Sequence, residues 1–211
     1  MSLAPPTVPV PRTPGRPPPE APRSHPGTGA AGRAAFWTVT RTGVLLRPMT
    51  PAEAVPARDF LVAQYEAFNA VDNTDEGHAT FRDFVAPDAL RRRLDAGNVT
   101  HLAERDGAIL GLCELHRDGY LTLLYVRGDH QGRGLGRRLL RCGLARLLAL
   151  EPETRQVRVR ATPYARRFYL RAGFEPLTDT VQDDHGIRFY PLALRITDDR
   201  GGADTPRVSD T

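Results

Sequence analysis

The sequence predicts a mixed α/β domain in which a mostly antiparallel central sheet is flanked by helices and one strand–helix–strand crossover is parallel. Three apolar runs, at residues 99–104, 109–116 and 120–126, are joined by short turns that contain Asp-Gly, a pattern typical of an antiparallel meander. A helix, an alternating strand and a second helix then follow up to residue 173, and this order favours a crossover between parallel strands.

Length and composition indicate one globular domain. The chain has 211 residues, of which 40% are hydrophobic and 26% charged, an ordinary globular mixture. No apolar run is long enough to span a bilayer, and the first residues lack the pattern of a secretory signal. The two cysteines, Cys113 and Cys142, are too few for a disulfide scaffold. We therefore expect a cytoplasmic protein without a membrane partner.

The two ends of the chain differ in composition from its middle. Ten of the 19 prolines fall within the first 26 residues, and such a segment cannot bury enough apolar surface to offset its ordering entropy. We predict a disordered Pro/Arg-rich arm over 1–35, a folded domain over 36–198 and a disordered tail over 199–211. The net charge of +4 is too diffuse for a stripe that tracks phosphates, so no nucleic-acid partner is expected.

The predicted domain begins with a strand and two helical stretches. Residues 44–49 form an apolar strand, and Thr50-Pro51-Ala52-Glu53 supplies a cap, a proline at the first helical position and an acid in the first turn. This helix is expected to run to Asn69. A polar link at residues 72–77 leads into a second helical stretch that ends at Gly97-Asn98.

After the meander come two helices and two strands. A helix is predicted over 134–150, because its leucines recur on one face, and the alternation within 157–161 indicates a half-buried strand. Thr162 and Pro163 provide a second cap-plus-proline helix start, for which Gly173 is the stop. A final strand is predicted over 187–196.

The stretch from Leu123 to Arg138 runs from an apolar strand through a glycine-rich turn into an arginine-rich helix. Three alternate glycines let the backbone approach a ligand closely, and a helix N-terminus adds unpaired donors, so a diphosphate is expected there. A Walker loop is excluded because the chain has no lysine, and GxGxxG fails because Arg137 stands at its last position.

Two blocks carry a resemblance to a known family. Gln131-Gly132-Arg133-Gly134-Leu135-Gly136 matches the pattern Q/R-x-x-G-x-G/A. About 20 residues later, residues 157–174 contain a strand, a cap, a Phe-Tyr pair and Gly-Phe. In this order the blocks resemble the GNAT superfamily over residues 44–196. The resemblance implies the GNAT fold and transfer of an acetyl group from acetyl-CoA to a primary amine, by direct attack in a ternary complex.

The resemblance also implies roles for single residues. The pantetheine amides would pair with backbone near Leu124–Val126, the pyrophosphate would rest on the amides of Gln131–Arg137, and Tyr169 would protonate the departing thiolate. A merely packing role for Tyr169 stays open. Gly128 departs from the proline frequent in the family, and Thr162 from its asparagine. The implied cofactor contacts are Leu124, Tyr125, Val126, Gln131, Gly132, Arg133, Gly134, Leu135, Gly136, Arg137, Thr162 and Tyr169.

Acidic residues are the candidates for handling the acceptor amine. Glu114 is the first choice for a general base, with a solvent-facing charge as the alternative. In the resembling family the link between the first two helices borders the acceptor site. Asp72, Asp75 and Glu76 are therefore expected either to attract a cationic amine or to form a capping turn. The histidines are scattered without ligand spacing, so no metal site is expected.

The acceptor stays open between a small amine, an amino acid, a drug-like amine and a protein N-terminus. A GNAT-fold module that binds acyl-CoA without chemistry is a rival hypothesis, which the presence of Tyr169 disfavours. Another rival is a protein-interaction role of the Pro-rich arm, which its PxxP spacing permits. A homodimer is compatible with the sequence.

Overall fold

The computed structural model describes residues 38–40 and 43–197 of the chain. The predicted arm and tail therefore lie outside the described residues. In chain order the elements are β1 (Thr38–Val39), β2 (Leu45–Pro48), η1 (Pro51–Glu53), α1 (Ala54–Phe68), η2 (Ala70–Asp72), α2 (Asp75–Phe84), α3 (Pro87–Asp95), β3 (Val99–Arg105), β4 (Ala108–His116), β5 (Tyr120–Val126), η3 (Gly128–His130), α4 (Leu135–Leu150), β6 (Gln156–Ala161), α5 (Arg166–Arg171), β7 (Glu175–Pro176), β8 (Gln182–Asp184) and β9 (Ile187–Arg195).

The strands form one sheet in the order β1-β2-β3-β4-β5-β6-β9-β7, and β8 pairs with β9. Among the described strands, only β5 and β6 pair in parallel, and α4 connects them. Every other pair is antiparallel. The predicted mixed α/β fold with one parallel crossover is therefore confirmed.

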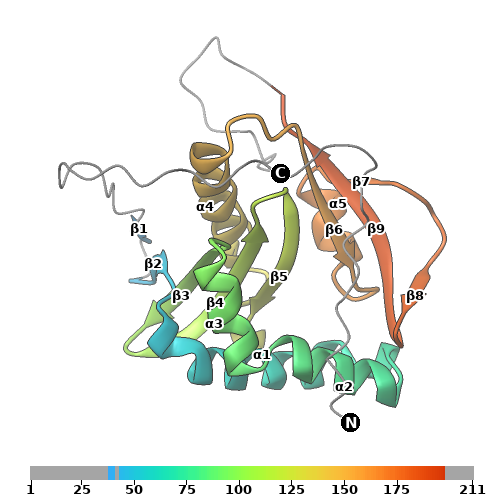
Figure 1. Cartoon of the computed structure of the whole chain (residues 1–211), viewed down its shortest axis with the longest axis horizontal. Coiled ribbons are helices and arrows are strands. Elements are labelled where there is room, and N and C mark those ends of the chain that lie inside the picture. The colour runs from blue at the N-terminus through green and yellow to red at the C-terminus, as the bar shows by residue number, and fades with distance from the viewer. Residues whose placement is uncertain (1–37, 41–42, 198–211) are drawn as a thin grey trace, which may run out of the picture. The chain divides into compact units, whose positions relative to one another are not determined.

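Helices cover both faces of the sheet (Figure 1). The amphipathic helix α4 packs on β3, β4 and β5, and its leucines share a core with β4, β6 and α5. The opposite face packs against α1, which in turn contacts α3, while α2 contacts β9. This second core includes Leu61 of α1, Phe81 of α2, Leu90 of α3 and Leu112 of β4. No helix within residues 38–40 and 43–197 is long and apolar enough to cross a membrane.

Tight turns follow the predicted chemistry, whereas two helices differ from expectation. Asp106 and Gly107 adopt φ angles of 52° and 76°, as a two-residue turn between antiparallel strands requires. The second helical stretch is split into α2 and α3, because Pro87 disfavours a helical conformation at the preceding residue, and Ala86 is extended with ψ at 143°. Helix α5 begins at Arg166 rather than next to Thr162, since a turn intervenes.

The parallel strands β5 and β6 pair over only two positions. Tyr120 lies opposite Arg158 and Leu121 opposite Val159, after which the strands diverge. The following part of β5 is paired to β4 on one side, and no described strand pairs with it on the other. This divergence leaves backbone groups of β5 open toward the space between the strands.

The start of α2 sits directly on the turn between β8 and β9. The Thr74 amide donates to the Gly186 carbonyl over 3.1 Å, and the Thr74 hydroxyl accepts from the Gly77 amide over 3.3 Å. A Cβ atom added at Gly77 would lie 2.2 Å from the Gly186 carbonyl oxygen. Only a glycine at position 77 permits this approach of two backbones.

Candidate active site

A cavity of about 520 Å³ opens where β5 and β6 diverge. Its walls come from β5, the glycine-rich turn before α4, the end of β6, α5 and the end of α1. The lining residues are Phe68, Asn69, Leu121, Thr122, Leu124, Tyr125, Val126, Gln131, Gly132, Gly134, Gly136, Arg137, Val159, Arg160, Thr162, Tyr164, Ala165, Arg167, Phe168, Tyr169 and Arg171.

The glycine-rich turn forms an open cradle at one end of this cavity. Gly132 and Gly134 have φ angles of 70° and 78°, and a Cβ atom added to either would meet no atom within 4 Å. Helix α4 begins directly after Gly134, whose position as N-cap provides no side-chain cap. The first amides of α4 therefore lack intrahelical acceptors, and such amides bind anions.

Positive charge surrounds the cradle. Arg137 of α4 and Arg167 and Arg171 of α5 line the same cavity. Arg137 also donates to the Arg171 carbonyl over 3.3 Å, which ties the two helices together beside the cradle. Open backbone donors and several guanidinium groups fit a ligand with more than one phosphate.

Ten of the twelve expected cofactor contacts line the cavity. The two that do not are Arg133 and Leu135. The Leu135 side chain belongs to the hydrophobic core, and Arg133 lines a separate hollow of about 120 Å³. The expected contact of Arg133 and Leu135 with the pyrophosphate is made by their backbone amides, so the placement of their side chains does not bear on it.

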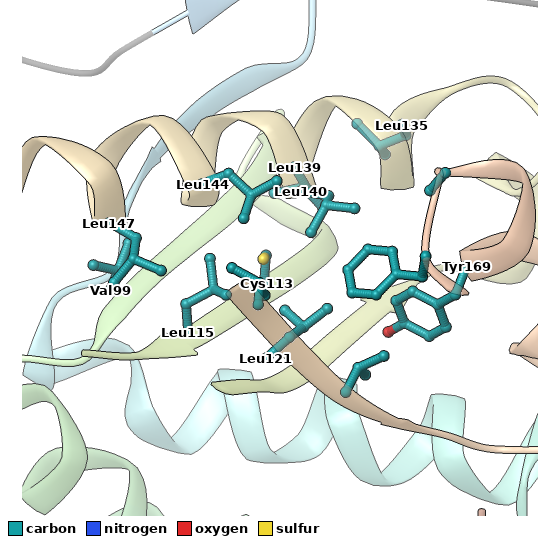
Figure 2. Close-up of a cluster of buried hydrophobic side chains, with 14 of the residues drawn as sticks. Val99, Cys113, Leu115, Leu121, Leu135, Leu139, Leu140, Leu144, Leu147 and Tyr169 are labelled. Carbon is teal, nitrogen blue, oxygen red and sulfur yellow. The ribbon is translucent and has the colours of Figure 1, made fainter. Parts of the chain in front are cut away.

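Tyr169 lies on α5 with its ring at the edge of the core and in the cavity wall. It is 4% exposed, and its ring meets those of Phe168 and Phe174 edge-on, with centroids 5.2 Å apart in each case. Figure 2 shows Tyr169 at one end of the buried cluster, with Leu147 at the other. Burial raises the pKa of Tyr169 well above its ordinary value, so the phenol stays protonated. Among the described residues its hydroxyl has no hydrogen-bond partner, and it is therefore available to a ligand.

Glu114 lies behind the cavity wall rather than in it. Its side chain is fully buried, and its Oε1 accepts from Arg93 Nε at 2.7 Å, from Asn98 Nδ2 at 3.2 Å and from Thr122 Oγ1 at 2.8 Å. Thr122 lines the cavity and Glu114 does not. Neither a position beside the acceptor nor the alternative of a solvent-facing charge matches this placement. Glu114 instead fixes the orientation of the Thr122 hydroxyl.

The acidic link between the first two helices does not reach the cavity. Asp72, Asp75 and Glu76 are absent from its lining. Thr74 caps α2 immediately before Asp75, and a Glu76 oxygen lies 3.5 Å from His185 Nδ1. The three carboxylates therefore belong to a capping turn and its surface, which was the alternative interpretation of this segment.

A bridge of side chains closes part of the cavity, and sequence analysis gave no sign of it. The rings of Phe68 and Tyr164 stack with centroids 5.2 Å apart, and the Tyr164 hydroxyl donates to Gln131 Oε1 over 2.5 Å. Gln131 Nε2 in turn donates to the Val126 carbonyl over 3.0 Å. A Cβ atom at Gly128 would lie 2.8 Å from Phe68 Cζ, so Phe68 fills the space that a proline there would need.

Sequence analysis also missed Thr122 and Arg160, which line the cavity. They directly follow the last paired positions of β5 and β6 and so stand on either side of the opening between the strands. The alternation of residues 157–161 predicted correctly that arginines share one face of this strand. Which residue borders the opening depends on the strand register, and local sequence does not encode it.

Comparisons with known proteins place this geometry in context. The sequence pattern of the acetyltransferase (GNAT) domain matches residues 69–196. No curated protein sequence matches the chain. A GCN5-related N-acetyltransferase from Rhodopseudomonas palustris superposes with a TM-score of 0.60 at 22% identity, covering 72% of this chain and 94% of its own. The PaiA N-acetyltransferase from Thermoplasma acidophilum, solved in complex with coenzyme A, gives a TM-score of 0.60 at 15% identity, covering 72% and 99%. A GNAT-family acetyltransferase from Staphylococcus aureus Mu50 gives 0.57 at 16% identity, covering 73% and 99%.

Proposed function

Because the chain belongs to the GNAT acetyltransferase family and is an N-acetyltransferase, we propose that it transfers an acetyl group from acetyl-CoA to a primary amine within a ternary complex. One observation carries the proposal: a single cavity begins where β5 and β6 diverge and contains both the glycine cradle of α4 and the Tyr169 phenol. The PaiA neighbour, solved in complex with coenzyme A, supports the same choice of ligand.

The residues of the cavity fit coenzyme A in charge and in shape. The amides after Gly132 and Gly134, with the guanidinium of Arg137, would hold the pyrophosphate. The backbone of Leu124–Val126, where no described strand pairs with β5 on this side, would pair with the amides of the pantetheine arm. These contacts would put the acyl end near the apex of the divergence, beside Thr122.

Acetyl-CoA supplies an activated thioester. Backbone N–H groups of β5 would stabilise negative charge on the carbonyl oxygen during attack, since they are dipoles held in place by the sheet. The phenol of Tyr169 would donate its proton to the departing sulfur, because burial keeps it protonated and it has no competing partner among the residues of the described part. The proton that the nitrogen loses as the amide forms would return through water to the Tyr169 phenolate. The attacking amine must be neutral before it reaches the carbonyl carbon.

No carboxylate and no imidazole lines the cavity within the described ranges. The proton of an ammonium acceptor therefore leaves to water, and the free amine is the reactive form. Glu114 lies behind Thr122 and acts by positioning the Thr122 hydroxyl, which donates to it.

The pH dependence of the reaction is expected to follow the acceptor and not the protein. kcat/KM should rise with pH up to the pKa of the acceptor amine and then stay level to about pH 10, because the raised pKa of Tyr169 keeps the phenol protonated. Profiles measured with two amines whose own pKa values differ by about two pH units should be displaced by that difference. A rising limb below pH 7 that stays fixed for both amines would reveal a protein base and contradict this account.

Titration with acetyl-CoA followed by a thiol-release screen across amines tests the proposed function. We expect saturable binding of acetyl-CoA and release of coenzyme A thiol that requires an acceptor. Binding without release across small amines, amino acids, drug-like amines and peptide N-termini would instead support a module that binds acyl-CoA without chemistry.

Gly134→Asp is expected to weaken acetyl-CoA binding at least tenfold, about 1.4 kcal/mol, because it places a negative charge in the cradle. The variant should fold, since the Cβ position is open and Asp tolerates a φ of 78° better than most residues. Gly134→Asn is the matched control, with the same shape and backbone preference but no charge, and should lose much less affinity. Calorimetric titration of both variants measures the difference, and equal affinities for the two would remove the pyrophosphate from this position.

A further inference from the structure

The cavity has a second end, distinct from the anion cradle, on the other face of the sheet. Val157, Val159 and Ala161 point into the core beneath α4, so Arg160 between them points to the face covered by α1. Thr122, the last α1 residue Phe68 and the following Asn69 line the cavity on this side as well. The cradle and the arginines of α5 lie at the opposite end, next to α4. The end at Thr122 and Arg160 is therefore the one left for an acceptor.

The charge of this cavity has one sign. Within residues 43–197, its charged lining residues are all arginines: Arg137, Arg160, Arg167 and Arg171. An acceptor with additional ammonium groups would find no carboxylate in the cavity wall to pair with. A carboxylate on the acceptor would find the guanidinium of Arg160.

Arg160 is held in place before any ligand arrives. Its Nη1 pairs with Asp184, which stands outside the cavity wall, and its guanidinium carbon lies 4.6 Å from the centroid of the Phe189 ring. Asp184 engages only this one nitrogen, and Nε and Nη2 have no hydrogen-bond partner in the described part of the chain. A guanidinium fixed on one side by an ion pair and stacked on a ring can present its other donors to a carboxylate.

Thr122 complements Arg160 across the opening. Its hydroxyl has one proton, which it donates to Glu114 over 2.8 Å, so toward the cavity the oxygen acts as an acceptor. The amine that accepts the acetyl group is a hydrogen-bond donor, so the Thr122 oxygen can accept a hydrogen bond from it. Arg160 directly follows Val159, the last residue of β6 paired with β5, and is therefore close to the apex where the reacting amine must sit.

We propose that the acceptor is an amino acid, whose carboxylate is bound by Arg160 while its amine donates to Thr122. This inference rests on the proposed acetyl transfer and narrows its substrate class. The acidic residues Asp72, Asp75 and Glu76 suggested a site that attracts a cationic amine. They do not line the cavity, and the charged residue near the acceptor end is an arginine, which attracts a carboxylate.

The experiment compares acceptors with and without a carboxylate, at a pH above the pKa values of their amines. Thiol release is measured with a panel of free amino acids, with the carboxamide of each, with the corresponding decarboxylated amines and with polyamines. The wild-type enzyme should use at least one free amino acid with a kcat/KM tenfold or more above its carboxamide. Equal or better use of the carboxamide, the decarboxylated amine or a polyamine would overturn the inference. If no amine in any group releases thiol, the proposed acetyl transfer itself fails, which is a different result.

Variants at Arg160 test the assignment to this residue. Arg160→Gln should abolish the preference for the carboxylate, mainly through a tenfold or larger rise in KM for the amino acid, with the carboxamide rate and acetyl-CoA affinity little changed. Arg160→Lys should recover part of the preference. Arg195→Gln is the control, since Arg195 is highly exposed on β9 and outside the cavity wall. If Arg160→Gln keeps the full preference for the carboxylate, the role of Arg160 is overturned. If that variant does not bind acetyl-CoA, the inference is tested by the wild-type enzyme and the panel of acceptors alone.

Discussion

Replacing Tyr169 with phenylalanine is expected to lower kcat about a hundredfold while acetyl-CoA affinity barely changes. The substitution keeps the ring, which packs edge-on against Phe168 and Phe174, and removes only the hydroxyl. General acid assistance is typically worth ~10²–10⁴-fold, and the low end applies because a thiolate is already a good leaving group.

Tyr190→Phe is the matched control for Tyr169→Phe. This substitution also removes a phenolic hydroxyl, but Tyr190 lies on β9 and does not line the cavity. Steady-state kinetics with the acceptor found in the amine screen, together with acetyl-CoA titration, separate the effects on kcat and binding. A kcat close to wild type in Tyr169→Phe would reduce Tyr169 to a packing residue.

The largest effect on stability is expected for Arg93→Met, which should lower the free energy of unfolding by about 3 kcal/mol or more. Arg93 pairs with Glu114, whose side chain is fully buried, and the Arg93 side chain is itself only 18% exposed. Removing the guanidinium leaves a carboxylate inside the protein with only Asn98 and Thr122 as donors. Urea denaturation of both proteins measures the difference.

A second substitution tells whether the stranded charge is the cause. Adding Glu114→Gln to Arg93→Met removes the charge but keeps an amide oxygen that can accept from Asn98 and Thr122. The double variant should therefore regain much of the lost stability. A loss below about 1 kcal/mol in Arg93→Met would show that the pair contributes no more than a surface ion pair.

Local chemistry allowed most elements of the fold to be predicted. Asp106-Gly107 favours a tight turn through its own backbone preferences. The glycines before α4 indicate the start of a helix whose first amides have no intrahelical acceptor. The break between α2 and α3 was also within reach, because Pro87 acts on its immediate neighbour. The late start of α5 was less accessible, since Thr162 also accepts a hydrogen bond from Asn69, which directly follows α1.

The candidate site required information that lies far apart in the sequence. Glu114 looked like an available base because its partner Arg93 lies 21 residues earlier, on a helix that packs against the sheet only in the folded chain. Arg160 lies on a strand whose alternation predicts only that it is half-buried, and the register of β5 with β6 puts this residue at the opening. Periodicity gives the face of a strand but not its neighbour across a crossover.

The contact between α2 and the β8–β9 turn links the position of Arg160 in the cavity to residues of α2 outside it. Asp184, which holds Arg160, is the last residue of β8, and the turn that follows it presses its Gly186 carbonyl against Gly77. A side chain at Gly77 would push this turn away and shift Asp184 with it. Arg160 would then lose its anchor without any change in the cavity wall. Acceptor preference could therefore drift during evolution through substitutions on the first turn of a helix that never meets the substrate.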